Sequence, residues 1–326
     1  MGTLTRIVVY ARDRASAERA TRAGFDRIAA LDRALSDYRE DSELMQLAAR
    51  AGQGPVAVSA DLFRVLQASQ SLSARSGGAF DATSGALTRL WRGARRLGEL
   101  PADERIQQAR ALTGYRHLHL DAGARTATLD LRGMQLDVGG IAKGDAADQA
   151  LAAIGRSGVD SALVALGGDI AVSDPPPGTT GWRIEVAPLQ LPGVPDRAPT
   201  VLHLRHAAVS TAGDAEQWMD VDGRRYSHIL DPRNGQPMLG RSSTTVIARS
   251  GLEADGLDTT AALLGAEAGA QLVDGVRGAA MRMERDAAGA GSQLRASARW
   301  PEPGAPVYDG GVTAIANAPQ QQVPSR

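Results

Sequence analysis

The order of its periodic segments most constrains how this chain can fold. Strand-like runs at 5–11, 161–166, 201–210 and 243–248 are separated by helical patterns and tight turns in an irregular order. A doubly wound parallel sheet requires a helical crossover between successive strands, and that regular alternation is missing from the sequence. The pattern therefore predicts an α+β fold in place of a doubly wound sheet.

Helices are predicted where apolar residues recur with helical spacing. Ile28 and Leu35 lie on one face of a first helix, and Ser59 has the side chain of an N-cap for a second. Alanine-rich periodicity predicts a helix over 146–154 that follows a glycine cluster. A last helix is predicted over 253–264, because a glycine follows directly and would end it.

Turn residues predict two further features and one boundary. Two short strands are expected within 127–138 around an Arg-Gly turn at 132–133, and a hairpin is expected around Asp222-Gly223. Clear periodicity is lost after about residue 284. We therefore expect a main domain at 1–284 and an extension at 285–326, with a disordered tail at "APQQQVPSR".

Composition excludes several classes of function. Lys and Arg number 36 against 37 Asp and Glu, so there is no basic excess of the kind that binds nucleic acid. The chain has no cysteine, which removes disulfides, thiolate metal sites and thiol nucleophiles. No apolar run approaches the roughly 20 residues of a membrane-spanning helix, and we expect no transmembrane segment.

The segment "GGIAKGD" at 139–145 has the composition of an anion-binding loop. It is not a Walker loop, because Lys143 precedes Gly144, and the dinucleotide fingerprint G-x-G-x-x-G does not fit from Gly139. A flexible backbone that leads into a helix N-terminus favours an anion, and Lys143 adds a full charge. A tight strand-to-helix turn explains the same glycines equally well. Asp145 would repel a pyrophosphate, so an anion here would require a metal ion.

The segment "ADGLDTT" at 254–260 could hold such an ion. On a helix, Asp255 and Thr259 are neighbours at i and i+4, on the side away from Leu257. Mg²⁺ takes few protein carboxylates and keeps other oxygen ligands, so this sparse set suits it better than zinc or calcium. Asp258 could be a further ligand or a solvated charge. An acidic residue at a helix start is also common without any metal.

The segment "RYSHILDPRNGQP" at 225–237 places His228 and Asp231 between a strand and a rigid turn. A histidine beside an acidic residue is a candidate for proton transfer near neutral pH. A structural imidazole bonded to the backbone is the competing interpretation. The segments "ALVALGGDI" and "STAGD" are two more strand ends with Gly-Asp, and each could be a plain turn.

In order along the chain, these segments resemble the FAD:protein FMN transferase family, the ApbE-type flavin transferases. The pieces that carry the resemblance are "LSDYREDSEL", "GGAFDATSG", "LDVGGIAKGDAAD", "ALVALGGDI", "STAGD", "RYSHILDPRNGQP" and "ADGLDTT", which span residues 35 to 260. The resemblance implies the family's α+β fold with packed helices around an antiparallel sheet. The chain departs from the family pattern at Leu35, Ala212 and Asn234.

The resemblance also implies roles for particular residues. Mg²⁺ would be held by the backbone carbonyl of Ala142 and by the side chains of Asp255 and Thr259. Because the chain has only three Phe, Phe80 and Tyr38 are the expected ring contacts of the flavin. The flavin contacts implied by the family pattern are Leu35, Ala79, Phe80, Asp81, Gly139, Asp145 and Ile229.

The expected activity is Mg²⁺-dependent transfer of FMN from FAD to a threonine or serine hydroxyl of another protein, with release of AMP. Lys143 would absorb charge on the pyrophosphate, and His228 would deprotonate or orient the acceptor, a role for which Asp145 and Asp231 are alternatives. Three other functions stay open. They are a Mg²⁺-dependent FAD pyrophosphatase, a flavin-binding protein without catalysis, and a flavin-dependent oxidoreductase.

The expected partners follow from the same resemblance. Acceptors in the family include subunits of membrane redox complexes that display an exposed threonine. The sequence shows neither an apolar leader after Met1 nor a cysteine for a lipid anchor. The family pattern implies the bacterial periplasm or the surface of the inner membrane, whereas a native start at Met1 would imply the cytoplasm.

Overall fold

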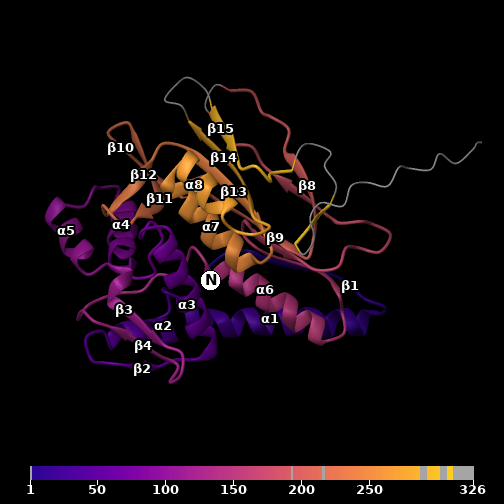
Figure 1. Cartoon of the computed structure of the whole chain (residues 1–326), viewed down its shortest axis with the longest axis horizontal. Helices are drawn as coiled ribbons and strands as arrows, with labels where there is room; N and C mark the ends of the chain where they lie inside the picture. Colours follow the sequence, from indigo (N-terminus) through magenta and orange to yellow (C-terminus); the bar gives the residue numbers. More distant parts are fainter. Residues whose placement is uncertain (1, 192–193, 215–216, 287–291, 302–306, 311–326) are drawn as a thin grey trace, which may run out of the picture.

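The computed structural model of the chain describes residues 2–191, 194–214, 217–286, 292–301 and 307–310. Its centre is a seven-stranded sheet in which all neighbouring strands are antiparallel, with helices packed on one face (Figure 1). The predicted α+β class is therefore confirmed. In spatial order the strands are β1 (Thr5–Tyr10), β5 (Ser161–Leu166), β6 (Asp169–Val172), β9 (Ala207–Gly213), β13 (Ser242–Ala248), β14 (Ala280–Asp286) and β15 (Ser292–Ala296).

Both faces of the central sheet are covered by apolar side chains. Successive residues of a strand point to opposite faces, and in β13 Val246 packs with the helices while Ile247 packs with a second, smaller sheet. The smaller sheet has the order β16 (Tyr308–Asp309), β8 (Thr200–Arg205) and β7 (Trp182–Val186). The result is a three-layer arrangement of helices, central sheet and small sheet.

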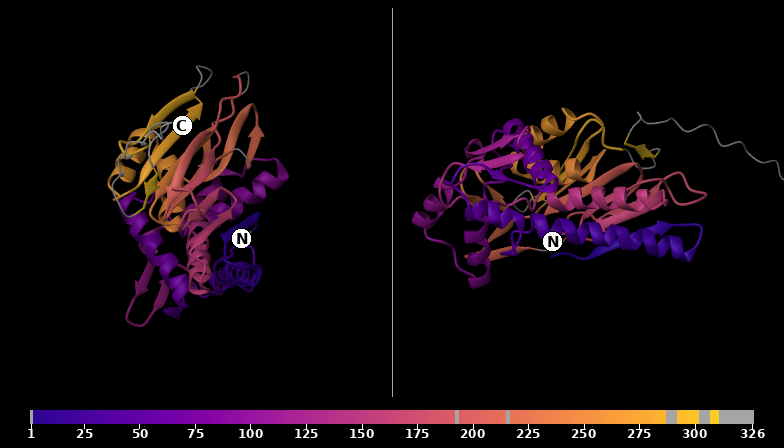
Figure 2. Two further views of the ribbon diagram at one scale, coloured as in Figure 1. Left: turned by 90° about the vertical axis from the view of Figure 1, so that its right-hand side faces the viewer. Right: turned by 90° about the horizontal axis from the view of Figure 1, so that it is seen from below.

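Three helices form the layer next to the central sheet. Helix α1 (Arg14–Leu35) lies beside α6 (Ala142–Arg156), and α6 packs against α7 (Gly251–Leu264), which covers β9 and β13 (Figure 2). The side chains of Asp13 and Ser250 cap α1 and α7 by accepting backbone N–H bonds in the first turn. Helix α8 (Ala266–Asp274) follows α7 and packs on it.

The remaining elements form one end of the molecule. They are α2 (Glu43–Ala49), β2 (Val56–Ala57), α3 (Ala60–Arg75), α4 (Gly85–Leu97), α5 (Asp103–Ala111), the 3-10 helix Tyr115–His117, β3 (Leu118–Asp121), β4 (Thr126–Leu129), β10 (Trp218–Val221), β11 (Arg224–Asp231) and β12 (Gln236–Leu239). Among them, helix α4 and the sheet of β10, β11 and β12 share a small core around Trp91 and Met219 (Figure 1).

Several predicted elements are confirmed. The opening strand, the first helix, the Ser59 cap, the hairpin at Asp222-Gly223 and the helix end at Gly265 all occur where the sequence placed them. The predicted strand at 201–210 is two strands, because His206 adopts a positive φ of 44° between them. Helix α6 begins at Ala142, four residues before its predicted start, and therefore includes Lys143 and Asp145 in its first turn.

Two further predictions require correction. Residues 134–138 are not a strand, although the apolar residues among them are buried in alternation. Their backbone bonds to another segment are made by Gln135, which accepts from Gly85, and by Asp137, which donates to Ala82. The boundary expected at 284–285 falls inside β14, and β15 and β16 of the extension join two of the sheets. The tail expected to be disordered lies outside the described residues.

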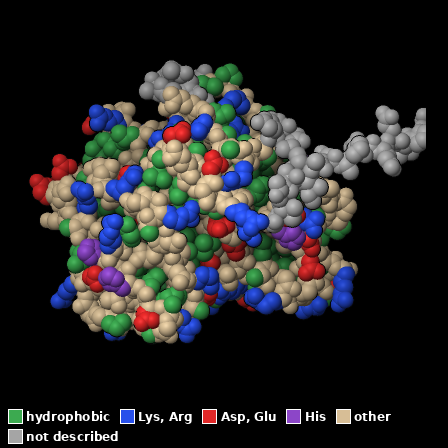
Figure 3. All heavy atoms as spheres, in the orientation of Figure 1, with side chains coloured by type: hydrophobic (Ala, Val, Ile, Leu, Met, Phe, Trp, Pro, Cys, Tyr) green, Lys and Arg blue, Asp and Glu red, His purple; other side chains and the backbone are tan. Residues whose placement is uncertain are grey.

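The surface agrees with the nearly balanced composition. Cationic and acidic side chains are interspersed over the face seen in Figure 3, with no cluster of a single sign across it. Among the described residues, no helix combines the length and the apolar character needed to cross a bilayer.

Candidate functional site

One large cleft collects the polar residues that the sequence singled out. Its volume is 1280 Å³, and the first turn of α6, the side of α7 and the ends of β6, β9 and β11 line it. Every predicted site residue except Asp145 lines this cleft. Those residues are Leu35, Tyr38, Ala79, Phe80, Asp81, Gly139, Ala142, Lys143, His228, Ile229, Asp255 and Thr259.

The first turns of α6 and α7 meet in direct backbone contact. A methyl group on Gly144 would lie 2.0 Å from the carbonyl oxygen of Gly251, and one on Gly251 would lie 2.4 Å from the carbonyl oxygen of Gly144. Only glycine permits this approach at either position. The contact allows the Gly144 N–H to donate to Asp255 Oδ2 at 2.9 Å. It therefore brings the glycine segment and the "ADGLDTT" helix into one site.

Three buried carboxylates share this part of the cleft. Asp169 at the start of β6 and Asp255 and Asp258 of α7 each offer an oxygen within 4.8 Å of the others. Lys143 Nζ lies 2.6 Å from Asp169 Oδ2 and 3.2 Å from Asp255 Oδ1. Fully ionised, the cluster has three negative charges and one positive charge, so its charge is unbalanced by two.

Ser210 of β9 shows how the cluster accommodates this excess. Its Oγ lies within hydrogen-bonding distance of Asp169 Oδ1 and 2.5 Å from Asp258 Oδ2. A hydroxyl has one proton to donate, so it can donate to only one of the two carboxyl groups. The other group must hold a proton and donate it to Ser210. At least one carboxyl group of the cluster is therefore neutral when no cation is bound.

The electrostatics agree with this proton count. Burial, together with the charge of Asp169, raises the pKa of Asp255 to about 7. Burial and the charges of Asp255 and Asp169 raise the pKa of Asp258 well above its usual range. Burial alone would lower the pKa of Lys143, but Asp255 and Asp169 outweigh it and hold that pKa above its ordinary value. Lys143 thus stays charged, while Asp255 and Asp258 hold a proton more tightly than free carboxyl groups do.

The donor set around the cluster suits a hard divalent cation. All the side-chain donors are oxygens, and a cation would replace the protons that now offset the repulsion. Thr259 Oγ1 donates to Asp258 Oδ1 at 3.1 Å and lies beside Gly140, where a methyl group would be 3.2 Å from it. Ala142 opens α6 in the same cleft.

The sequence alone does not decide the role of two members of this cluster. The Gly-Asp pair at Asp169 is compatible with a plain turn, and Asp258 is compatible with a ligand or with a solvated charge. Both are buried, with 3% and 1% of their surface exposed. The signal for Asp169 was its position directly after a buried strand and two glycines, but only the pairing of β6 with β9 brings it near Ser210.

Aromatic residues also line the cleft. Tyr38 is 67% exposed, and the guanidinium of Arg92 lies 4.0 Å from the centre of its ring. Arg92 also bonds Asp37 at 2.7 Å, which fixes the guanidinium above the ring. The carboxylate of Asp81 accepts N–H bonds from Thr83 and Tyr115, so it holds its own loop in shape.

His228 is exposed to the cleft, and its Nδ1 lies 3.2 Å from the carbonyl oxygen of Gln217. The cleft walls shield the ring from bulk water, and with the charges of Arg95 and Lys143 they lower its pKa. The imidazole is therefore neutral near pH 7. Asp231 is not its partner, because Asp231 is bonded by the guanidinium and N–H of Arg233.

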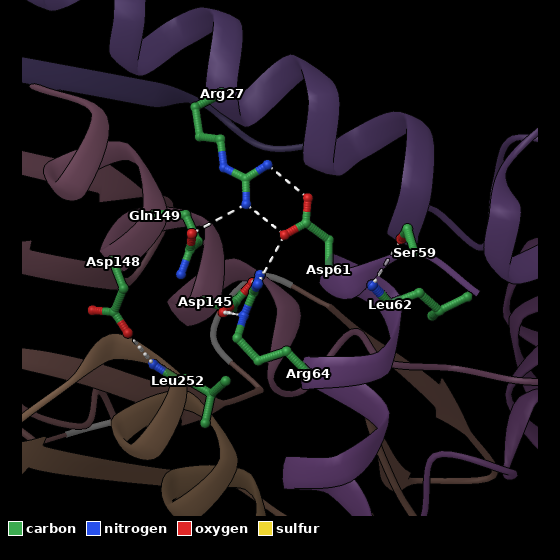
Figure 4. A network of polar contacts seen from close by, with 9 residues as sticks. All are labelled: Arg27, Ser59, Asp61, Leu62, Arg64, Asp145, Asp148, Gln149 and Leu252. Atoms are coloured by element: carbon green, nitrogen blue, oxygen red, sulfur yellow. Dashed lines mark hydrogen bonds and ion pairs between the residues drawn. The ribbon is translucent and has the colours of Figure 1, made fainter. Parts of the chain in front are cut away.

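Asp145 does not face the cleft. Its two carboxylate oxygens are bonded by Arg64 of α3 at 2.9 and 2.7 Å, and only 2% of its side chain is exposed (Figure 4). The predictions that Asp145 contacts the flavin or serves as a base do not fit this geometry. No local pattern indicated Arg64 as the partner of Asp145, because the two residues are 81 positions apart.

Comparison with known proteins identifies relatives along almost the whole described chain. Residues 1–282 match the model of the ApbE family. The FAD:protein FMN transferase of Treponema pallidum is 33% identical over 282 residues, which cover 82% of this chain and 77% of that protein. The protein of the same name from Vibrio cholerae is 33% identical over 239 residues, covering 72% and 70%.

Solved structures give the same result for the fold. The apo form of the Pseudomonas stutzeri flavinyl transferase ApbE is similar with a TM-score of 0.79 and 33% sequence identity, covering 91% of this chain and 92% of that one. The flavin transferase ApbE from Vibrio cholerae is similar with a TM-score of 0.80 and 28% identity, covering 91% and 94%.

Proposed function

Because this chain belongs to the ApbE family, we infer that its cleft is the active site of a flavin transferase. The enzyme transfers FMN from FAD to another protein, as the names of its relatives state for them. The cleft of 1280 Å³ exceeds the roughly 300–1,000 Å³ of ordinary small-molecule pockets, which leaves room for a dinucleotide and part of an acceptor.

The observation that carries the proposal is the unbalanced acidic cluster beside the α6 N-terminus. A pyrophosphate could not approach three carboxylates unless a cation lay between them. We propose that Mg²⁺ binds there through the Ala142 carbonyl, Asp255 and Thr259, with Asp169 and Asp258 close enough to share it. When bound, the ion would neutralise charge on the pyrophosphate oxygens.

In the proposed reaction, the hydroxyl oxygen of an acceptor threonine or serine attacks the phosphorus on the riboflavin side of FAD. A new phosphoester bond forms, the bond between that phosphorus and the bridging oxygen breaks, and AMP leaves with the bridging oxygen. Lys143 holds a fixed positive charge at the cleft wall, where negative charge increases in the transition state. His228, neutral and exposed to the cleft, is placed to take the hydroxyl proton.

The test is an assay with FAD, MgCl₂ and a purified redox-complex subunit that displays a threonine. Mass spectrometry should show the acceptor heavier by one FMN less one water, and AMP should appear in equal amount. A threonine-to-valine acceptor should stay unmodified, and chelator should abolish transfer. Transfer at the full rate in chelator would refute the metal proposal, and AMP released without an acceptor would identify a pyrophosphatase.

A further inference from the structure

A series of ion pairs binds the first turn of α6 to helix α3. Arg64 Nε and Nη2 donate to the two oxygens of Asp145, and Arg64 Nη1 donates to Asp61 Oδ1 at 2.8 Å (Figure 4). A guanidinium fork on a carboxylate fixes both the separation and the relative orientation of the two groups. The contact therefore restrains the rotation of the turn that carries Asp145.

The series of ion pairs is anchored in α1. Arg27 donates to both oxygens of Asp61, at 2.6 and 2.5 Å, and its Nη2 donates to Gln149 Oε1 at 3.1 Å. Two arginines thus match two aspartates, with no charge left over. Arg64 cannot shift without breaking its bond to Asp61, and both residues lie on α3. Helix α3 is therefore the mount for Asp145, and Arg27 links that mount to α1.

The contact of α6 with α7 restrains the helix at other places. Gly144 and Gly251 set how closely the two helices approach, and the carboxylate of Asp148, one turn further along α6, accepts N–H bonds from the start of α7. In the first turn of α6, Asp145 is the side chain that is held from the α3 side. Asp145 lies one turn after Ala142 and two residues after Lys143. A rotation about the glycine contact would move the Ala142 carbonyl and the Lys143 ammonium within the cleft.

We propose that Arg64 is a positioning residue, whose fork on Asp145 sets the rotation of the first turn of α6 and so places Ala142 and Lys143 for the cation and the pyrophosphate. This inference rests on the proposed function, because it assigns Ala142 and Lys143 their roles. Arg64 does not touch the cleft and acts only through Asp145.

A purely structural ion pair would predict a different result. Replacing both charges with apolar side chains removes the unpaired-charge penalty, and such replacements often restore stability. The double variant Arg64→Met/Asp145→Leu therefore separates folding from positioning. If the pair only holds the helices together, a folded double variant should act like the wild type. If the pair sets rotation, it should fold and still be impaired.

The experiment measures Mn²⁺ affinity by electron paramagnetic resonance of the free ion, together with kcat and KM for FMN transfer. In the double variant we expect the Mn²⁺ dissociation constant to rise about tenfold and kcat to fall about tenfold, in the range seen when partners of metal ligands are removed. KM for FAD should change by less than about threefold, because the expected ring contacts at Tyr38 and Phe80 are not substituted.

Two further variants make the test decisive. Arg27→Met breaks the same network, but its described contact with α6 is at Gln149, about 10 Å along the helix from Ala142. It should lower the melting temperature and leave Mn²⁺ affinity and kcat unchanged. Arg64→Lys keeps the charge and loses the fork, so it should show the Mn²⁺ defect even if the double variant does not fold.

Wild-type Mn²⁺ affinity and kcat in Arg64→Lys, or in a folded double variant, would overturn the proposal. An equal Mn²⁺ defect in Arg27→Met would also overturn it, because the effect would then come from general loosening. Absence of FMN transfer by the wild-type enzyme would refute the proposed function instead. The Mn²⁺ affinities would still decide whether Arg64 positions the turn.

Discussion

Two charged clusters meet the first turn of α6, and they differ in how completely their charges are matched. On the α3 side, Arg27 and Arg64 match Asp61 and Asp145 one for one. On the cleft side, Lys143 is the single cationic side chain among the described residues that pairs with the cluster of Asp169, Asp255 and Asp258. Neighbouring residues of one helical turn therefore belong to a matched cluster and to an unmatched one.

The difference separates a structural role from a binding role. A matched cluster satisfies its own charges and offers nothing to a ligand, whereas buried carboxylates in excess must hold protons or a cation. The raised pKa values of Asp255 and Asp258 and the lowered pKa of Asp61, about 2, express this difference in the direction of each shift. Each prediction below changes one carboxylate and asks to which cluster it belongs.

The largest effect is expected from Asp255→Ala. Loss of this carboxylate removes a proposed cation ligand, and the lost transition-state stabilisation of several kcal/mol should lower the rate of FMN transfer about 10³-fold. Steady-state assays of AMP release with an acceptor measure the change. The control is Asp61→Asn in the matched cluster, which should keep the rate within about threefold. A small loss in Asp255→Ala would place the cation elsewhere.

Asp148 of α6 is intermediate between the two clusters. Its carboxylate is bonded by backbone N–H groups, and none of its described partners is a cationic side chain. It accepts N–H bonds from Gly251 and Leu252 at the start of α7, yet burial raises its pKa to about 6, outweighing those bonds. The folded state thus binds this proton more tightly than the unfolded state. Stability from this group is present below about pH 4 and is lost as pH rises to 6, by up to about 3 kcal/mol.

Urea unfolding of the wild type and of Asp148→Asn between pH 4 and 6 tests this case. The variant cannot titrate at this position, so its free energy of unfolding should fall less steeply across the interval. The slope against pH is compared, because the asparagine also changes the bonds to α7. Identical slopes for the wild type and the variant would contradict this prediction. They would show that the backbone N–H groups stabilise the ionised form of Asp148 to the same degree as the arginines stabilise that of Asp61.

The matched cluster should show the opposite pH dependence. Hydrogen bonds from Arg27 lower the pKa of Asp61 to about 2, so its contribution is present above about pH 4 and is lost as pH falls to 2. Asp61→Asn should lower the free energy of unfolding at neutral pH by about 2 kcal/mol. Acid titrations followed by circular dichroism should show that the variant loses little further stability below pH 4. An undiminished acid transition would contradict the assignment.

The sequence predicted those features of the site that depend on local spacing. Asp255 and Thr259 share a helix face because they are four residues apart, and the glycine cluster leads into a helix as expected. Asp169 and Arg64 could not be placed, because their partners come from strand pairing and helix packing between distant segments. Ser210 is 41 residues from Asp169, and Arg64 is 81 residues from Asp145.

The fold was predictable to a similar extent. Burial with period two or with helical spacing located most strands and helices, because local side-chain direction follows from backbone geometry. The segment 134–138 has the same alternation but finds its backbone partners in a loop, and alternation carries no information about the partner. The flavin contact at Asp145 was implied by the family pattern alone, which carries no information about Arg64 of the distant helix α3.

The smallest effect on the free energy of unfolding is expected from Asp258→Asn. This substitution should stabilise the fold, whereas Asp61→Asn should destabilise it. Without a cation, burial and the charges of Asp255 and Asp169 raise the pKa of Asp258, so the folded wild-type protein binds a proton there more tightly than the unfolded chain does. An asparagine has the same shape and is neutral without taking up that proton. The variant should therefore unfold at a higher free energy in chelator at pH 7, by about 1 kcal/mol.

Urea unfolding in chelator compares Asp258→Asn with Asp61→Asn, which change the same group in the two clusters. Raising the pH should enlarge the gain from Asp258→Asn, because holding the proton becomes more costly for the wild type. Saturating Mg²⁺ should reverse the gain, since the cation stabilises the carboxylate form of the wild type. Destabilisation in chelator would mean that Lys143 already balances the charge of the cluster, and the distinction between the two clusters would fail.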